Sequence, residues 1–253
     1  INRDLSIVCG LAWPLTPIFR AANFLPGLGK SIGQVPVLLQ FSANLAEAGH
    51  LLYTDLSPMM AMTHAEMLTE DYLHQIYSIL SDAQPALASA AEILADAKAI
   101  RSEIDTAQLP EEIAHPIRLF DERYDEIQQG LQILMVIPDL LGTVEQPRAY
   151  LVLAQNHDEL RATGGFISGI GVAEFAAGDL LRLTMQDSYA LDDYSKPYPP
   201  PPEPISRFML AGLWLPRDAN WSPDFPTAAR AVQDLYAIST DQVTHGVIAV
   251  DQE

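Results

Sequence analysis

The sequence predicts an α+β protein, in which an all-α N-terminal half forms a helical hairpin or bundle and an α/β half with a mixed sheet follows. Apolar residues recur at helical spacing from about residue 36 to residue 135. After residue 147, short β-branched and aromatic segments are separated by turn residues. We therefore expect a helical domain at residues 1–138, a linker at 139–147 and an α/β domain at 148–253.

Composition restricts the classes of function. Hydrophobic residues make up 49% of the chain, which is enough for a sizeable core. The chain has 14 Lys and Arg against 33 Asp and Glu, and this excess of acid argues against binding to nucleic acid or to an anionic membrane surface. One cysteine, Cys9, excludes an internal disulfide and a Cys-rich zinc site, and we expect a buried, inert thiol.

The helical half contains several proline signals. A helix is predicted from Pro36, and one long helix or two helices are predicted over residues 60–108, with Pro85 marking a kink or a restart. Pro110 and the acids after it are typical of a helix start, and this helix should run to about Met135. The pattern predicts a long helical hairpin over about residues 60–135.

The second half should contain four strands, one helix and a proline-rich loop. The strands are predicted at residues 148–155, 164–175, 180–185 and 243–250, the helix at 227–236 and the loop at 192–204. The last strand ends close to Glu253, so we expect the fold to continue beyond this sequence. No run of about 18 apolar residues is present, so no membrane span is predicted within it.

Three polar clusters follow predicted strands, where ligands of open α/β sheets bind. In the first, at residues 155–166, Arg161 could hold a phosphate or carboxylate, and Asn156, Gly164 and Gly165 could approach a ligand. The alternative is a polar turn in which Arg161 pairs with a neighbouring acid.

The second cluster, at residues 187–193, is acidic. Asp187 and its neighbours could hold Mg²⁺ through carboxylate oxygens and waters. The alternative is a solvated acidic loop.

The third cluster, at residues 216–227, is dense in turn-forming residues. Arg217, Asp218, Asn220 and Asp224 are the candidate site residues here. The alternative is structural: Ser222 or Asp224 would cap the following helix, and the aromatic side chains would anchor the loop.

The segments at residues 148–166, 217–226 and 245–251 resemble the hallmark of an uncharacterised bacterial envelope family, domain of unknown function 4012. The resemblance extends loosely over the helical half. It implies an extracytoplasmic protein of the cell envelope, held in the membrane by a segment upstream of Ile1.

This family is in turn distantly similar to the LytR-CpsA-Psr proteins, which transfer glycopolymers from a polyprenyl-pyrophosphate carrier. That similarity implies Mg²⁺ as cofactor, Arg161 and Arg217 as pyrophosphate ligands, and Asp187 or Asp251 as a metal-binding acid. The correspondence follows the order of elements rather than a shared motif. The downstream arginines of that family have no counterpart in this sequence.

Two functions remain open, and with them whether the protein is an enzyme. The first is a structural or accessory subunit of a larger membrane or cell-surface assembly, with other envelope or membrane proteins as partners. The alternative is a Mg²⁺-dependent phosphotransferase acting on a polyprenyl-linked glycan. Convergence of Arg161 and Arg217 on one open cavity would favour the alternative.

Overall fold

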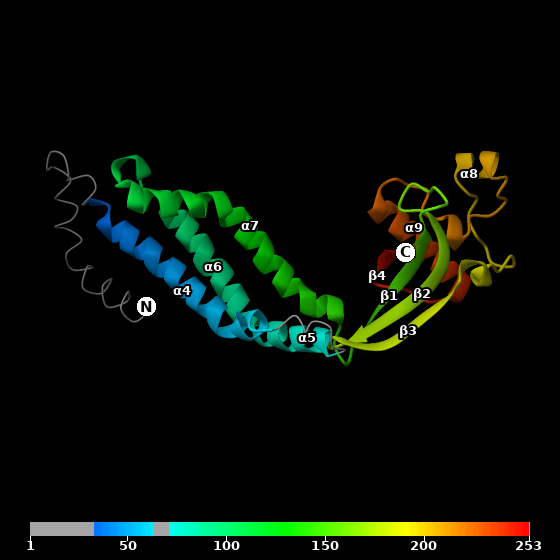
Figure 1. Cartoon of the computed structure of the whole chain (residues 1–253), viewed down its shortest axis with the longest axis horizontal. Helices are drawn as coiled ribbons and strands as arrows, with labels where there is room; N and C mark the ends of the chain where they lie inside the picture. The colour runs from blue at the N-terminus through cyan, green and yellow to red at the C-terminus, as the bar shows by residue number, and fades with distance from the viewer. Residues whose placement is uncertain (1–32, 63–70, 253) are drawn as a thin grey trace. The chain divides into compact units, whose positions relative to one another are not determined.

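The computed structural model describes residues 33–62 and 71–252 (Figure 1). The chain divides into two compact units, residues 1–138 and 139–253. The described part of the first unit is helical, and the second contains a four-stranded mixed sheet with helices, so the predicted α+β class is confirmed. The prediction for Cys9 concerns a residue outside the described part.

Four α-helices and one short 3-10 helix make up the described part of the first unit. They are α4 (Val35–Met60), α5 (Tyr72–Asp82), α6 (Gln84–Arg101), η4 (Thr106–Gln108) and α7 (Glu111–Leu141). Pro85 lies in the first turn of α6, so it marks a restart. As predicted, α7 follows Pro110 and carries two acids in its first turn. It continues through Pro138 to Leu141, so the first residues of the expected linker are helical instead. A proline inside a helix can bend it without ending it.

The described helices of the first unit share one apolar core. Side chains of α4, α6 and α7 share this core, and α6 and α7 run in opposite directions (Figure 1). Alanines on α6, including Ala90 and Ala97, are fully buried, and their small size lets α4 lie close to α6. On α7, Phe120 meets the ring of Phe41 edge-on with 5.2 Å between centroids.

The second unit is built on a sheet with strand order β3-β2-β1-β4. Its strands are β1 (Arg148–Asn156), β2 (Phe166–Ala176), β3 (Asp179–Asp187) and β4 (Gly246–Asp251). β1 pairs antiparallel with β2 and parallel with β4, and β2 pairs antiparallel with β3. The remaining elements are η5 (Ser188–Leu191), α8 (Glu203–Phe208), η6 (Pro216–Asp218) and α9 (Phe225–Thr240).

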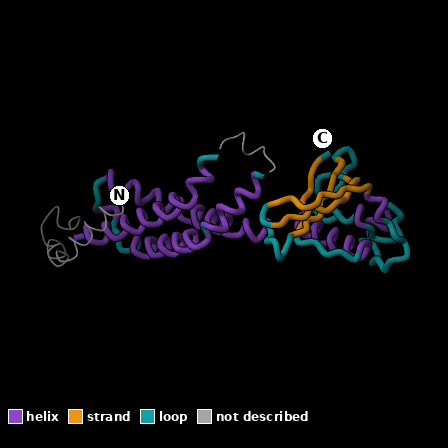
Figure 2. Tube along the Cα trace, turned by 90° about the horizontal axis from the view of Figure 1, so that it is seen from below, coloured by secondary structure: helices purple, strands orange, loops and turns teal. Residues whose placement is uncertain are grey.

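The two faces of the sheet differ in how they are covered. Helices and loops of this unit lie on one side (Figure 2), where Leu151, Leu153 and Val172 pack against Val232 and Leu235 of α9. The opposite side carries side chains that alternate with those of the core. We call it the apolar sheet face, and its members include Val152, Leu183, Met185, Ile248 and Val250.

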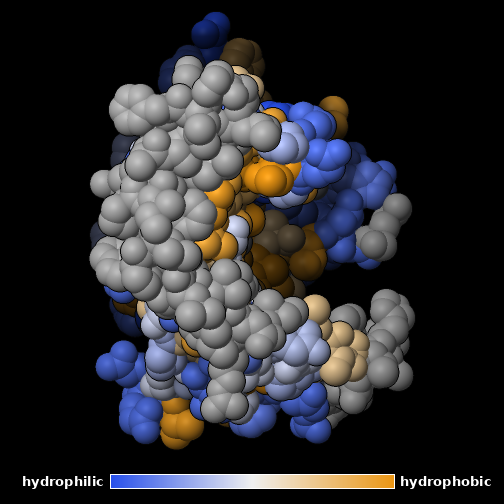
Figure 3. Space-filling view, turned by 90° about the vertical axis from the view of Figure 1, so that its left-hand side faces the viewer, coloured by the Kyte–Doolittle hydropathy of each residue, from blue (hydrophilic) through white to orange (hydrophobic). Residues whose placement is uncertain are grey.

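The described surface of the helical unit mixes both kinds of residue. Hydrophobic residues are visible between hydrophilic ones in the end-on view of Figure 3. Among the helices of residues 33–62 and 71–252, none combines the length and apolar character needed to cross a bilayer.

Candidate functional site

The loop between β1 and β2 places Arg161 beside the sheet. Asn156 Oδ1 accepts a hydrogen bond from the Asp158 amide at 3.1 Å, which turns the chain as soon as β1 ends. Gly164 and Gly165 have φ values of +88° and +113°. A Cβ atom on Gly165 would lie 2.1 Å from the carbonyl oxygen of Asn156. These three predicted ligand residues therefore shape the loop.

Asp218 is the point at which the two predicted arginines meet. Its Oδ1 lies 4.0 Å from Nη2 of Arg161, and its Oδ2 lies 3.8 Å from Nε of Arg217. Asp218 ends η6 and is buried, with 8% of its surface exposed. The structure thus brings Arg161, Arg217 and Asp218 together, although the two arginines are far apart in the sequence.

Arg217 is committed to partners inside the protein. Its Nη1 donates to the Asp192 carboxylate, which is nearly buried. Its guanidinium also lies 4.5 Å from the centre of the Tyr189 ring, where a cation is favoured. Arg217 is absent from the walls of the neighbouring cavity, so its side chain serves as an internal ion-pair partner.

Arg161 is less fully paired. Its Nη1 donates to the Leu160 carbonyl at 3.1 Å, and its Nη2 lies 3.7 Å from Glu159. Its guanidinium packs 5.2 Å from the centre of the Phe166 ring. Its Nε is buried without a hydrogen-bond partner among the described residues. The expected pairing with a neighbouring acid therefore exists, and the side chain still borders open space.

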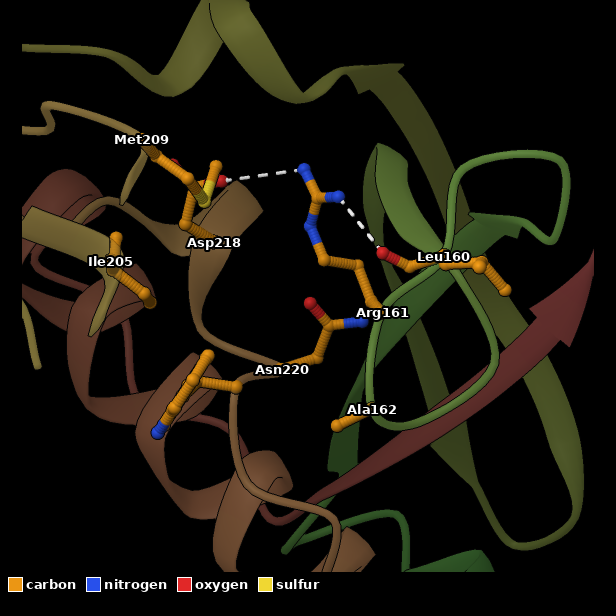
Figure 4. A pocket seen from close by; sticks show the side chains of 8 residues that line it. Leu160, Arg161, Ala162, Ile205, Met209, Asp218 and Asn220 are labelled. Atoms are coloured by element: carbon orange, nitrogen blue, oxygen red, sulfur yellow. Dashed lines mark hydrogen bonds and ion pairs between the residues drawn. The ribbon is translucent and has the colours of Figure 1, made fainter. Parts of the chain in front are cut away.

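A cavity of about 280 Å³ lies beside Arg161 (Figure 4). Most of its walls are apolar, and its polar groups are the side chains of Arg161, Asp218 and Asn220 and the indole N–H of Trp221. Its full lining is Leu160, Arg161, Ala162, Ile205, Met209, Asp218, Asn220 and Trp221. We call it the Arg161 cavity.

The electrostatics of the Arg161 cavity centre on Asp218. Burial raises the pKa of Asp218 above its usual value of 3.8, although the guanidinium groups of Arg217 and Arg161 act in the opposite direction. The carboxylates of Glu159 and Asp192 also raise it. Three carboxylates against two guanidinium groups leave no excess positive charge for an anion.

The predicted metal-binding acids do not share a site. Asp187 caps η5 by accepting from the Tyr189 amide at 2.9 Å, and it lies at the end of β3. Asp251 lies at the end of β4, where Oδ1 is 3.0 Å from Nδ1 of His157. β3 and β4 are the two edge strands of the sheet, about 14 Å apart at a spacing of about 4.8 Å per strand.

No group of three or more potential metal ligands occurs in the part of the chain that the structure describes. Asp218 is flanked by two guanidinium groups at 4.0 Å and 3.8 Å, which disfavours a second cation there. The Asp218 carboxylate therefore does not fit the role of a Mg²⁺ ligand.

The other residues of the third cluster hold the fold in place. Asn220 is fully buried, and its Nδ2 donates to the Gly165 carbonyl at 2.6 Å, which joins this loop to the β1–β2 loop. Asp224 caps α9 by accepting from the Thr227 amide at 3.0 Å. For Asp224 the structural alternative is the one observed.

Several contributors to the site gave no recognisable signal in the sequence. Ile205 and Met209 line the Arg161 cavity from α8 and its end, which follow the proline-rich loop. The rings of Phe166 and Tyr189 hold the two guanidinium groups. Apolar residues of this kind are indistinguishable from core residues until their neighbours are known.

Comparison with known proteins adds one match. No curated protein and no solved structure matches the chain. The matching family has the description "Protein of unknown function (DUF4012)", and the match covers residues 145–253, the part that holds the whole sheet and the Arg161 cavity. Residues 145–253 are therefore a DUF4012 domain.

Proposed function

We propose that the protein is a structural or accessory subunit of a larger assembly of the cell envelope, on the extracytoplasmic side of the membrane. The envelope location rests on the family resemblance of the strand and loop motifs. The role as a subunit rests on the apolar sheet face, where Leu183, Met185, Ile248 and Val250 are each 40–57% exposed.

The apolar sheet face is extensive because it spans all four strands. Leu183 and Met185 lie on one edge strand and Ile248 and Val250 on the other, with Val152 between them. None of these side chains is charged, in a chain of net charge −19. Apolar patches of this kind mark surfaces that other proteins cover. We infer that the apolar sheet face packs against another apolar protein surface.

The ion pairs around Asp218 support the same proposal. Arg217 is held by Asp192, Asp218 and the Tyr189 ring, so it is unavailable to a pyrophosphate. Such a network joins η5, η6 and the β1–β2 loop and stabilises their arrangement.

The test is the size of the native assembly in the cells that produce the protein. Leu183→Asp would bury a charge in the interface, so the protein should migrate as a free chain after mild detergent extraction. Gln186→Asp adds the same charge to an exposed position on the opposite side of β3, and it should leave migration unchanged. Equal migration of Leu183→Asp and the unaltered protein would disprove the proposal.

The alternative is a phosphotransferase acting on a polyprenyl-pyrophosphate-linked glycan. The observation in its favour is that Arg161 borders an open cavity next to Asp218. Titration calorimetry with pyrophosphate and Mg²⁺ tests it: this function requires binding that Arg161→Ala weakens. Absence of binding, or equal binding by the variant, would leave the accessory role.

A further inference from the structure

The Arg161 cavity has a mouth of exposed apolar side chains. Leu160 is 89% exposed, Met209 47% and Trp221 45%, and all three line the cavity. Phe208 and Leu210, on either side of Met209, are also exposed. Exposed apolar side chains gathered at the mouth of a cavity are typical of a binding surface.

Two acceptors of the cavity receive no hydrogen bond from the described residues, and one donor of the cavity, Nε of Arg161, gives none. Among the described residues, none donates a hydrogen bond to the Asp218 carboxylate, whose nearest cations are the two guanidinium groups. The Nδ2 of Asn220 is used by the Gly165 carbonyl, which fixes the amide orientation, and its Oδ1 has no partner. Figure 4 shows this oxygen turned toward Arg161.

The charged groups around the Arg161 cavity favour a neutral ligand that can donate a hydrogen bond. A cationic ligand would meet Arg161 and Arg217, both within about 4 Å of Asp218. An anionic ligand would meet the buried Asp218 carboxylate as well as Glu159. An acyl chain offers no donor, and a sugar ring would leave many hydroxyl groups against apolar walls.

We propose that the Arg161 cavity binds a peptide segment of a partner protein. One large apolar side chain of the segment fills the cavity, and a backbone N–H donates to Asp218. A volume of about 280 Å³ lies just below the range of about 300–1,000 Å³ for ligand pockets. This volume suits a single side chain with its peptide group. The proposal concerns a surface separate from the apolar sheet face and does not depend on it.

The test uses a minimal mimic of such a segment. N-acetyl-leucine N-methylamide is titrated into the intact chain, and binding is followed by NMR at the amides of Ala162, Asn220 and Trp221. Saturable shifts are expected at these residues. An analogue with both amide nitrogens methylated has no N–H to donate, and it should bind at least about tenfold more weakly.

A matched pair of variants separates the cavity from general hydrophobic binding. Ala162→Trp fills the mouth from an exposed position and should weaken binding at least about tenfold. Ala95→Trp adds the same ring to an exposed position on α6 and should have no effect. Equal binding by Ala162→Trp would overturn the proposal. So would shifts of the same residues at lower concentrations of pyrophosphate or methyl glucoside.

Discussion

At the scale of single residues, the β1–β2 loop depends on backbone positions that an L side chain cannot occupy. Gly165 combines a positive φ with close contact to the Asn156 carbonyl, and its own carbonyl accepts from the buried Asn220. The paired glycines therefore position Arg161 by allowing the loop to fold back on β1. The sequence predicted that these glycines allow a close approach to a ligand. In the structure, the group that lies close to Gly165 is the carbonyl of Asn156.

We expect Gly165→Ala to reduce the free energy of unfolding by about 2–4 kcal/mol, because the added Cβ meets a backbone oxygen in a strained conformation. Urea denaturation of the whole chain measures the change. Gly212→Ala is the control: nothing lies within 4 Å of its added Cβ, and its effect should stay within about 0.5 kcal/mol. Equal stability of the two variants would contradict the assignment.

His157 should titrate above its ordinary pKa of 6.5, because Asp251 accepts a hydrogen bond from the ring and attracts its charge. A raised pKa means that this contact stabilises the fold fully below pH 6.5 and that the contribution is lost as pH rises through the folded pKa. NMR titration of the imidazole protons measures the pKa. Asp251→Asn should lower it toward 6.5, and a value at or below 6.5 in the unaltered protein would refute the prediction.

At the scale of elements, local signals predicted the strands and α9, although the observed ends differ from the predicted ones by up to four residues. Ser222 and Asp224 are the two candidate caps in the sequence, and the structure shows that Asp224 caps α9. The β2–β3 connection is a two-residue turn in which Ala177 and Gly178 both have positive φ, as tight hairpins require. Which face of β3 remains open depends instead on where α9 packs.

Asp224→Ala should lower the midpoint of thermal unfolding, because the first amides of α9 lose their acceptor. Hydrogen bonds from Thr227 lower the pKa of Asp224 below 3.8. The ionised cap therefore stabilises the fold fully above pH 3.8, and this stabilisation is lost as the pH falls through the folded pKa. The difference from the unaltered protein should therefore vanish in acid. Asp234→Ala, which removes an exposed carboxylate from the same helix, should not lower the midpoint. A midpoint unchanged by Asp224→Ala at neutral pH would count against the cap.

At the scale of the whole molecule, the residues that the structure describes form two separate apolar cores. One is formed by side chains of α4 to α7, and the other lies between the sheet and α9. The apolar spacing changes once along the sequence, from a helical period before residue 138 to strand-like segments after residue 147, and each pattern buries its apolar side chains with its own period.

Separate cores predict separate responses to cavity mutations. Leu87→Ala removes a fully buried side chain of α6 and should destabilise the helical unit by about 2–5 kcal/mol. Hydrogen exchange should become faster in α4 to α7 and stay unchanged in β1 to β4. Leu235→Ala, in the second core, should have the converse effect. Faster exchange in both units after either change would show that the cores are coupled.

The sequence by itself determined the fold class, the helix start after Pro110 and the strands of the sheet, because these depend on local periodicity and backbone preference. It left Pro85 open between a kink and a restart, and the structure shows the restart. The sequence also selected Arg161, Arg217 and Asp218. Only the tertiary structure showed that Arg217 is paired with Asp192 and packed on the Tyr189 ring, while Arg161 borders a cavity. Only the tertiary structure placed Asp187 and Asp251 on opposite edges of the sheet. These contacts and positions depend on which side chains, distant in the sequence, become neighbours in the fold. The local spacing of residues does not determine that.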